Sequence, residues 1–249
     1  MAYRNGIVRI LCLVVLALIW ELVSQSGWIS SQLLPPLSEV TLTAYQLIQT
    51  EEVQINLAST MIVVFSSFIT AVIIGIPVGI LIVSNRYWKK VLMPFVMFPL
   101  GIPKSIFLPV FLLVFGIGFG QKFAFGVFSA IFLVIMNCGT AISSVQPSHL
   151  FTARAYGASM GQISRYIYLQ AMLPTILEGL RLTMIFTQTG VILAEMYASR
   201  TGVGTLLNNW GEAYQISNLL AGILLISFFS ICINEAFIWF ERRLMGAYE

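Results

Sequence analysis

The chain has 249 residues, of which 58% are apolar and only 9% are charged, and its net charge is +3. Soluble domains carry roughly 25% charged residues, which cover their surface. A lipid-facing surface does without them, because charge in lipid is costly. The composition therefore excludes an ordinary soluble domain and predicts an all-α membrane helical bundle, a single domain over residues 1–249. The basic residues are dispersed, so we expect no nucleic-acid partner.

Apolar runs long enough to cross a bilayer recur along the chain. A spanning helix needs ~20 mostly apolar residues. We expect six transmembrane helices, at residues 7–23, 57–83, 91–117, 123–142, 182–197 and 218–240. We interpret the first as a retained helix and not a signal peptide, because no clean cleavage site follows it. The polar stretch 24–56 is long enough for an amphipathic segment and contains no span.

The third apolar run is interrupted by four prolines, Pro94, Pro99, Pro103 and Pro109, and by Lys104. Irregular backbone at membrane depth is tolerated only against protein or a water-filled cavity. We therefore place this run beside a translocation path, with Pro103, Lys104 and Pro109 as candidate path residues. The alternative is a short interfacial helix followed by a plain span.

Glu195 is the fourth candidate for the path, because ionisable residues inside a span are functional candidates. It lies toward the outer end of the fifth span. It either lines a gate or pairs with Lys104 or Arg200, and the alternative is a position among the lipid headgroups.

The positions of glycine and cysteine support three further predictions. Gly75 and Gly79 have the spacing that permits close helix packing, and the alternative is a proline-kinked helix with glycine at two crowded places. Residues 116–120, with glycine at every second position, predict a tight turn and not a nucleotide-binding loop. The three cysteines lie far apart in apolar runs, so we expect small core residues and neither disulfides nor a metal site: Cys12, Cys138 and Cys232.

The distribution of Lys and Arg predicts the orientation, because cytoplasmic loops are enriched in both. With the N-terminus inside, ten of the 13 basic residues lie on the inner side. Lys122 and Arg200 lie outside, and Lys104 lies within a span. Both termini are therefore expected in the cytoplasm.

Residues 143–181 form a long amphipathic segment on the cytoplasmic side. Gly157 and Ser159 can turn the backbone and start a new helix. Ile163, Ile167 and Ala171 then recur on one helical face, and we expect Pro174 to end the unit. This helix-turn-helix either docks on a partner protein or rests among lipid headgroups.

The same segment resembles the coupling loop of the inner-membrane components of binding-protein-dependent ATP-binding-cassette (ABC) importers. The family pattern is E-A-A-x-x-x-G-x9-I-x-L-P, and Ala153, Gly157, Ile167 and Leu169 match it. Phe151, Thr152 and Gln170 depart from it, so a salt bridge of the missing glutamate is not expected here. Residues 34–40, 107–118 and 192–207 resemble the nitrate, sulfonate, taurine and bicarbonate branch.

The resemblance implies a permease with the fold of a type I ABC importer. Its coupling segment, residues 143–181, docks on a cytoplasmic ATPase dimer through eight residues: Ala153, Arg154, Ala155, Gly157, Ala158, Ser159, Ile167 and Leu169. ATP and Mg²⁺ are bound by that partner, and this chain binds no cofactor. A second permease copy, as a homodimer, and an extracytoplasmic substrate-binding protein complete the importer. The resemblance further implies that this importer lies in the bacterial inner membrane, among lipid, and moves a small anion inward.

Besides a purely structural membrane protein, two other functions remain open from the residues alone. One is a secondary transporter or channel that works by itself, although only one span is strongly interrupted and the other half shows no matching partner. The other is a membrane-embedded enzyme, which needs clustered catalytic or metal-binding side chains. With one His, no Asp and scattered Cys, we expect a transport subunit and not an enzyme.

Overall fold

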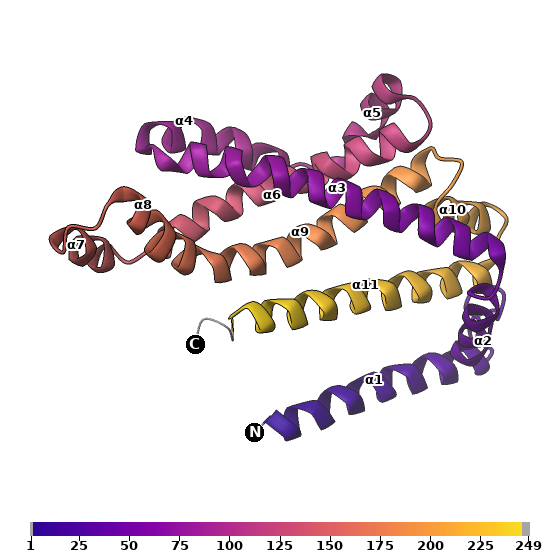
Figure 1. The fold of residues 1–249 in the computed structure, drawn as a ribbon. Helices are drawn as coiled ribbons and strands as arrows, with labels where there is room; N and C mark the ends of the chain where they lie inside the picture. Colours follow the sequence, from indigo (N-terminus) through magenta and orange to yellow (C-terminus); the bar gives the residue numbers. More distant parts are fainter. Residues whose placement is uncertain (1, 246–249) are drawn as a thin grey trace.

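The protein is described by a computed structural model that covers residues 2–245. This part of the chain contains helices and no strand, which confirms the all-α prediction (Figure 1). The helices are α1 (Ala2–Gln25), α2 (Leu37–Leu47), α3 (Glu51–Ser84), α4 (Arg86–Met97), α5 (Leu108–Phe115), α6 (Phe119–Ser143), α7 (Pro147–Ala155), α8 (Met160–Ile163), α9 (Leu169–Tyr197), α10 (Val203–Glu212) and α11 (Ile216–Met245). A π-helical segment, Ser164–Tyr168, joins α8 to α9.

Five of the six expected spans are found by length and composition. Helices α3, α6 and α11, and the run Met160–Tyr197 that ends with α9, are each long and apolar enough to cross a membrane. The segments Arg86–Leu100 and Lys104–Phe115 pass the same test as a pair. The remaining span is the first in the chain, residues 7–23, which corresponds to α1, and the apolar part of that helix, Leu11–Gln25, is shorter.

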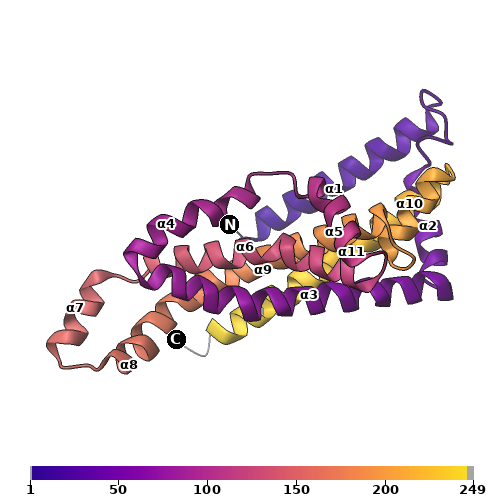
Figure 2. The same cartoon turned by 90° about the horizontal axis from the view of Figure 1, so that it is seen from above.

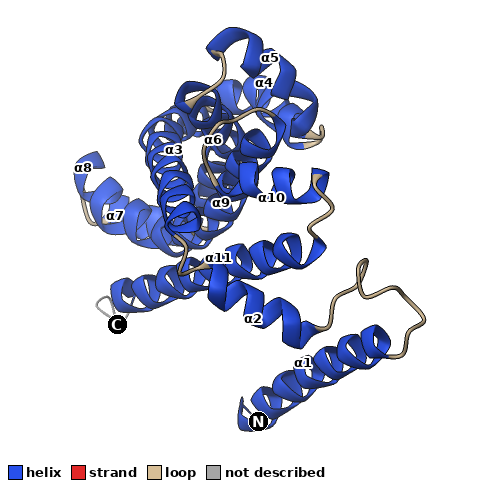
Figure 3. Ribbon diagram, turned by 90° about the vertical axis from the view of Figure 1, so that its right-hand side faces the viewer, coloured by secondary structure: helices blue, strands red, loops and turns tan. Residues whose placement is uncertain are grey.

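The centre of the bundle is α6, which packs along both α3 and α9. One apolar cluster joins α3 to α9 through Val64, Phe68 and Val191. Helix α11 covers α9 and packs against α2. Helix α1 contacts α2 and stands away from the other helices (Figure 3).

The glycine pair in α3 sets the distance between α3 and α6. A Cβ on Gly75 would lie 2.8 Å from Val134 Cγ1, and a Cβ on Gly79 would lie 2.8 Å from Cys138 Cβ. Both contacts are too short for carbon atoms, so any side chain at these positions would push the helices apart. Close packing is therefore confirmed as the role of this spacing.

The interruption of the third span is also confirmed. Its two halves meet at 89°, and α5 has only 8 residues, so no plain span starts near Ile106. The glycine-rich turn that follows has positive φ angles at Gly116 (67°) and Gly118 (147°), which favour glycine. Pro103 and Pro109 lie at the starts of the two short helical pieces after the break and are exposed.

Two local predictions were wrong. Pro174 does not end the coupling unit but lies inside α9, where the neighbouring Met172 and Ile176 pack in an apolar cluster and hold the helix together. Helix α3 contains the expected span 57–83 and extends it back to Glu51, because the Thr50 side chain accepts a hydrogen bond from Val53 N–H and caps the helix there.

The second error concerns the cysteines. Cys138 is buried against α3, but Cys12 and Cys232 are exposed on their helices. A lipid-facing surface accepts such weakly polar side chains, so an apolar run does not by itself show that a cysteine is in the core.

The α3–α6 contact gives a first prediction. Gly79→Ala should lower the thermal unfolding midpoint, because the new Cβ meets Cys138 Cβ and the Ile135 backbone, and overpacking typically costs ~1–3 kcal/mol. Gly211→Ala is the control, since its Cβ has only Leu219 Cδ2 nearby, at 3.9 Å. Equal midpoints for the two variants in the same detergent would contradict the close-packing account.

Candidate functional site

Helices α7 and α8 form a hairpin, residues 147–163, whose turn is built around Gly157. The Gly157 N–H donates to Arg154 O, and the Ala158 N–H donates to Ala153 O, both at 3.0 Å. These two bonds are the Schellman motif that ends a helix. Gly157 has a φ of 75°, and a Cβ there would meet nothing within 4 Å. The turn therefore needs glycine for its backbone conformation and not for space.

The second arm of the hairpin starts with a reciprocal cap. The Gln162 N–H donates to Ser159 Oγ at 3.3 Å, and the Ser159 N–H donates to Gln162 Oε1 at 2.8 Å. This capping box satisfies two backbone donors that the first turn of a helix leaves free. The predicted start of a helix at Ser159 is confirmed.

The base of the hairpin is fixed to the bundle. Ile167 packs on an apolar cluster that includes Val145 and Met172, at the junction of α6, α7 and α9. Ser144 Oγ also donates to Ala171 O at 3.0 Å. The hairpin therefore moves with α6 and α9 and is not a free loop.

The tip of the hairpin carries exposed apolar side chains. Figure 2 shows α7 and α8 projecting beyond the ends of α3 and α6. Phe151 and Tyr156 are 77% and 88% exposed, and Met160 is also exposed. A cavity of about 370 Å³ opens between the arms, lined in part by Ala153 and Ile163. Exposed apolar groups around a hollow are typical of a protein interaction site.

The structure brings most of the predicted coupling residues together at this tip. Residues 153–155 and 157–159 form the end of α7 and the turn. Ile167 and Leu169 lie at the base, where Ile167 is partly buried and Leu169 is exposed. His149 is exposed on α7. We call this end of the bundle the hairpin end and the opposite end the α10 end.

Lys104 follows the break in the third span and points into the bundle. Its Nζ donates to the backbone oxygen of Ser129 in α6 and lies 4.8 Å from the centre of the Phe186 ring in α9. The residue is partly buried. The break therefore places one cation against the middle of α6 and α9.

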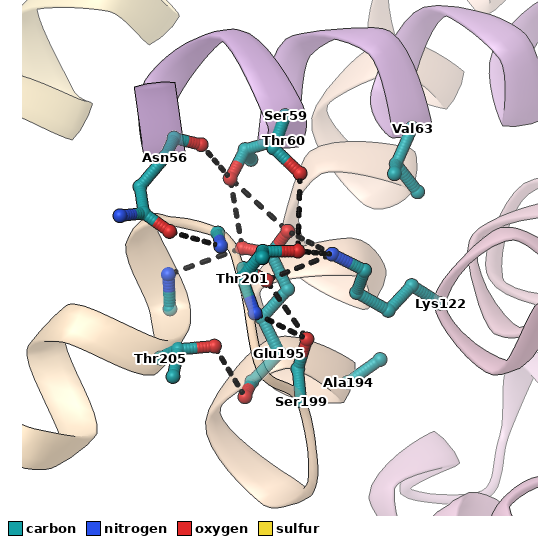
Figure 4. Close-up of polar contacts among 12 residues, drawn as sticks. Asn56, Ser59, Thr60, Val63, Lys122, Ala194, Glu195, Ser199, Thr201 and Thr205 are labelled. Atoms are coloured by element: carbon teal, nitrogen blue, oxygen red, sulfur yellow. Dashed lines mark hydrogen bonds and ion pairs between the residues drawn. The ribbon is translucent and has the colours of Figure 1, made fainter. Parts of the chain in front are cut away.

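A buried ion pair lies at the α10 end (Figure 4). Lys122 Nζ and Glu195 Oε1 are 3.3 Å apart, and the two side chains are 3% and 0% exposed. Thr60 Oγ1 lies 3.1 and 2.9 Å from the two carboxylate oxygens, and the Gly204 N–H donates to Oε2 at 3.1 Å. The carboxylate thus has several partners, as a buried charge requires.

The same network holds the loop before α10. Lys122 Nζ donates to Thr201 O at 2.8 Å, and the Gly202 N–H donates to Asn56 Oδ1 at 2.6 Å. A Cβ on Gly202 would overlap the Glu195 carboxylate. The ion pair therefore ties α10 to α3, α6 and α9.

This network corrects one expectation. Glu195 pairs with Lys122 and not with Lys104 or Arg200, and it lines no open cavity in this conformation. Lys122, which the charge count assigns to the outer side, lies at the α10 end, but it is 2% exposed and is a buried residue of α6. No local signal connects Lys122 with Glu195, because the pair forms only when α6 and α9 pack.

Residues 71–246 match the model of the binding-protein-dependent transport system inner membrane component. The chain belongs to this family. It is therefore an inner-membrane ABC transporter permease, which confirms the family expected from residues 143–181.

Several relatives of the permease are known. It is 29% identical to the taurine transport system permease protein TauC of Escherichia coli K12, over 93% of this chain and 86% of the relative. It is 26% identical to the putative aliphatic sulfonates transport permease protein SsuC of Bacillus subtilis 168, over 93% and 84%. These relatives confirm the sulfonate and taurine branch and a transport role.

The fold of the permease matches a solved transporter. A chain of the MetNI methionine ABC transporter, in an inward-facing conformation, superposes with a TM-score of 0.66 over 74% of this chain and 92% of that chain, at 20% identity. This match confirms the type I ABC importer fold.

The ion pair gives a second prediction. Lys122→Met should destabilise the permease by about 3–5 kcal/mol, because it leaves the Glu195 carboxylate buried without its counter-ion. The double variant Lys122→Met/Glu195→Gln should lose less than the sum of the two single variants. Additive losses of unfolding free energy would contradict direct coupling.

Proposed function

We propose that this permease carries a small sulfonate or related anion inward, driven by a separate ATPase subunit that grips the α7–α8 hairpin. The observation that carries the proposal is the Gly157 turn, which presents exposed apolar side chains on a base fixed to α6 and α9. Six of the residues proposed for docking lie at the tip of the hairpin, namely Ala153, Arg154, Ala155, Gly157, Ala158 and Ser159. Ile167 and Leu169 lie at its base.

We infer the orientation from the charges at the two ends. In Figure 1, α1 begins and α11 ends toward the hairpin end. Beyond residues 1–10 of the chain, most Lys and Arg residues lie in the segments at or nearest the hairpin end: Arg86, Lys89, Lys90, Arg154, Arg165, Arg181, Arg242 and Arg243. This asymmetry supports a cytoplasmic hairpin and cytoplasmic termini. ATP and Mg²⁺ would then bind to the ATPase on that side.

A second permease copy would complete the path. One face of α9 is exposed and mostly apolar, through Leu182, Phe186 and Leu193. Lys104 lies beside Phe186. With a second copy facing α9, Lys104 would meet the solute between the two subunits and favour an anion by charge. A substrate-binding protein would deliver that solute at the α10 end.

The third prediction tests the docking turn. Gly157→Val should insert and fold but lose most of its co-purification with the ATPase, because a β-branched residue does not adopt a φ of 75° without strain. Gly157→Asn should keep most of its co-purification with the ATPase, since asparagine tolerates this backbone conformation. The measurement is the ratio of ATPase to permease after affinity purification from membranes.

Gly161→Val is the size-matched control. A Cβ on Gly161 meets only Ser159 Oγ, at 4.0 Å, and it lies in α8 and not in the turn. Its ATPase ratio should equal that of the wild type. A normal ratio for Gly157→Val would contradict the proposal.

A further inference from the structure

Helix α4 begins with three cations on one face of its first turn. Arg86, Lys89 and Lys90 are spaced i, i+3 and i+4, so their side chains are neighbours on the helix surface. Arg86 and Lys90 are exposed, and Lys89 is half-buried against α6. We call these three residues the α4 cation cluster. Figure 2 shows that α4 begins on the same side of the bundle as α7 and α8.

The position of the α4 cation cluster costs the helix stability. The first turn of a helix carries a partial positive charge, so cations are unfavourable there. Like charges at i and i+4, as at Arg86 and Lys90, add to that cost. Arg242 and Arg243, by contrast, lie in the last turn of α11, where the helix dipole favours cations. The preference for cations on the cytoplasmic side therefore does not by itself explain their place at the start of α4.

No carboxylate on the helices that pack against α4 compensates the cluster. These helices are α3 and α6. The two acids of α3, Glu51 and Glu52, lie in its first turn, at the α10 end, and α6 contains no acid. Within residues 2–245, the ion pair that forms is Lys122–Glu195, which is also at the α10 end. An anion that compensates the cluster therefore has to come from outside the described part of the chain.

Lys89 is the member of the cluster that water reaches least. Its ammonium group has three donors. The acceptor that it finds among the described residues is the backbone oxygen of Gly139, at the long distance of 3.5 Å. The packing holds this side chain close to α6, because a Cβ on Gly139 would overlap Met93 of α4. Lys89 thus presents a fixed charge with free donors beside the two exposed cations.

An aromatic and apolar face adjoins the cluster. Trp88, Val91 and Phe95 are spaced i, i+3 and i+7 along one side of α4, and all three are exposed. Tyr87 lies edge-on to Trp88, with the ring centres 5.6 Å apart, and it is exposed as well. Trp and Tyr are enriched at the headgroup level of a membrane, whereas Phe and Val favour its hydrocarbon. The first two turns of α4 therefore offer cations, headgroup-level aromatics and an acyl-chain surface side by side.

We propose that the start of α4 binds an anionic phospholipid of the cytoplasmic leaflet. The phosphodiester would lie over the α4 cation cluster, where the planar fork of Arg86 can donate two hydrogen bonds and Lys89 and Lys90 act as point charges. One acyl chain would follow Trp88 and Phe95 into the membrane. The inference rests on the proposed orientation, with the hairpin in the cytoplasm, and goes beyond the proposed transport function.

The test identifies the lipid that stays bound to the permease–ATPase complex. The complex is reconstituted in nanodiscs with equal parts of phosphatidylglycerol and phosphatidylcholine. The lipids that it retains in detergent are then counted by native mass spectrometry. We expect a preference of roughly tenfold to a hundredfold for phosphatidylglycerol, the range that up to three cations near a membrane surface give.

Two matched variants assign that preference to α4. Arg86→Gln/Lys90→Gln removes two exposed cations of the cluster, so it should fold normally and bring the preference close to one. Arg242→Gln/Arg243→Gln is the control, because it removes two exposed cations from the hairpin end, where Arg243 also lies near an aromatic ring. This control should keep the wild-type preference. Equal losses in the two variants would overturn the inference, because any charge on that side would then suffice.

A free phosphate ion shares the chemistry of the lipid headgroup. The thermal unfolding midpoint distinguishes the two sources, measured in phosphatidylcholine nanodiscs with added inorganic phosphate or added phosphatidylglycerol. We expect only the lipid to raise the midpoint, because inorganic phosphate has no acyl chain to cover Trp88 and Phe95. An equal rise with inorganic phosphate would overturn the inference.

ATP-driven uptake is measured in parallel, in proteoliposomes of phosphatidylcholine with and without phosphatidylglycerol. Helix α4 is the first half of the interrupted third span, and Lys104 begins the helical piece after the break. A lipid that anchors α4 should therefore support uptake, and we expect faster uptake with phosphatidylglycerol. Full uptake in phosphatidylcholine alone, with no lipid preference in the complex, would overturn the inference and leave the proposed function standing.

Discussion

The buried ion pair between Lys122 and Glu195 fixes one end of this molecule. It holds the α10 end through bonds to α3, α9 and the loop before α10. Such a pair is stable at membrane depth only when each charge has several partners, and here the carboxylate has them. The hairpin end has no comparable polar network among the described residues, and apolar clusters hold it. Buried polar contacts therefore hold the α10 end, whereas apolar contacts hold the hairpin end. This difference suits a bundle that pivots at the α10 end.

The proposed mechanism follows from this asymmetry. The helix that follows the Gly157 turn runs without a gap from Met160 to Tyr197, passing Phe186, which lies beside Lys104, before it reaches the ion pair. A displacement of the hairpin by an ATPase would thus travel along one helix past the proposed contact of Lys104 with the solute. Rigid-body rocking of this kind is common where packed helices have two arrangements.

The sequence predicted those features whose signal comes from residues close together in the chain. Apolar runs, the prolines of the third span and the Gly157 turn each carry their signal within a few residues, and the structure confirms them. Lys122 and Glu195 are 73 positions apart, so charge counting does not show that they form a buried pair. Pro174 failed as a helix end because tertiary packing at Met172 overrides local propensity.

The central claim is that transport by this permease requires a separate ATPase engaged at the hairpin. The most direct test is uptake of labelled taurine into proteoliposomes that contain the permease and binding protein, with and without the ATPase subunit. We expect ATP-dependent uptake only when the ATPase is present, and uptake equal to that of empty vesicles in its absence. Uptake at the full rate by the permease without the ATPase would contradict the account.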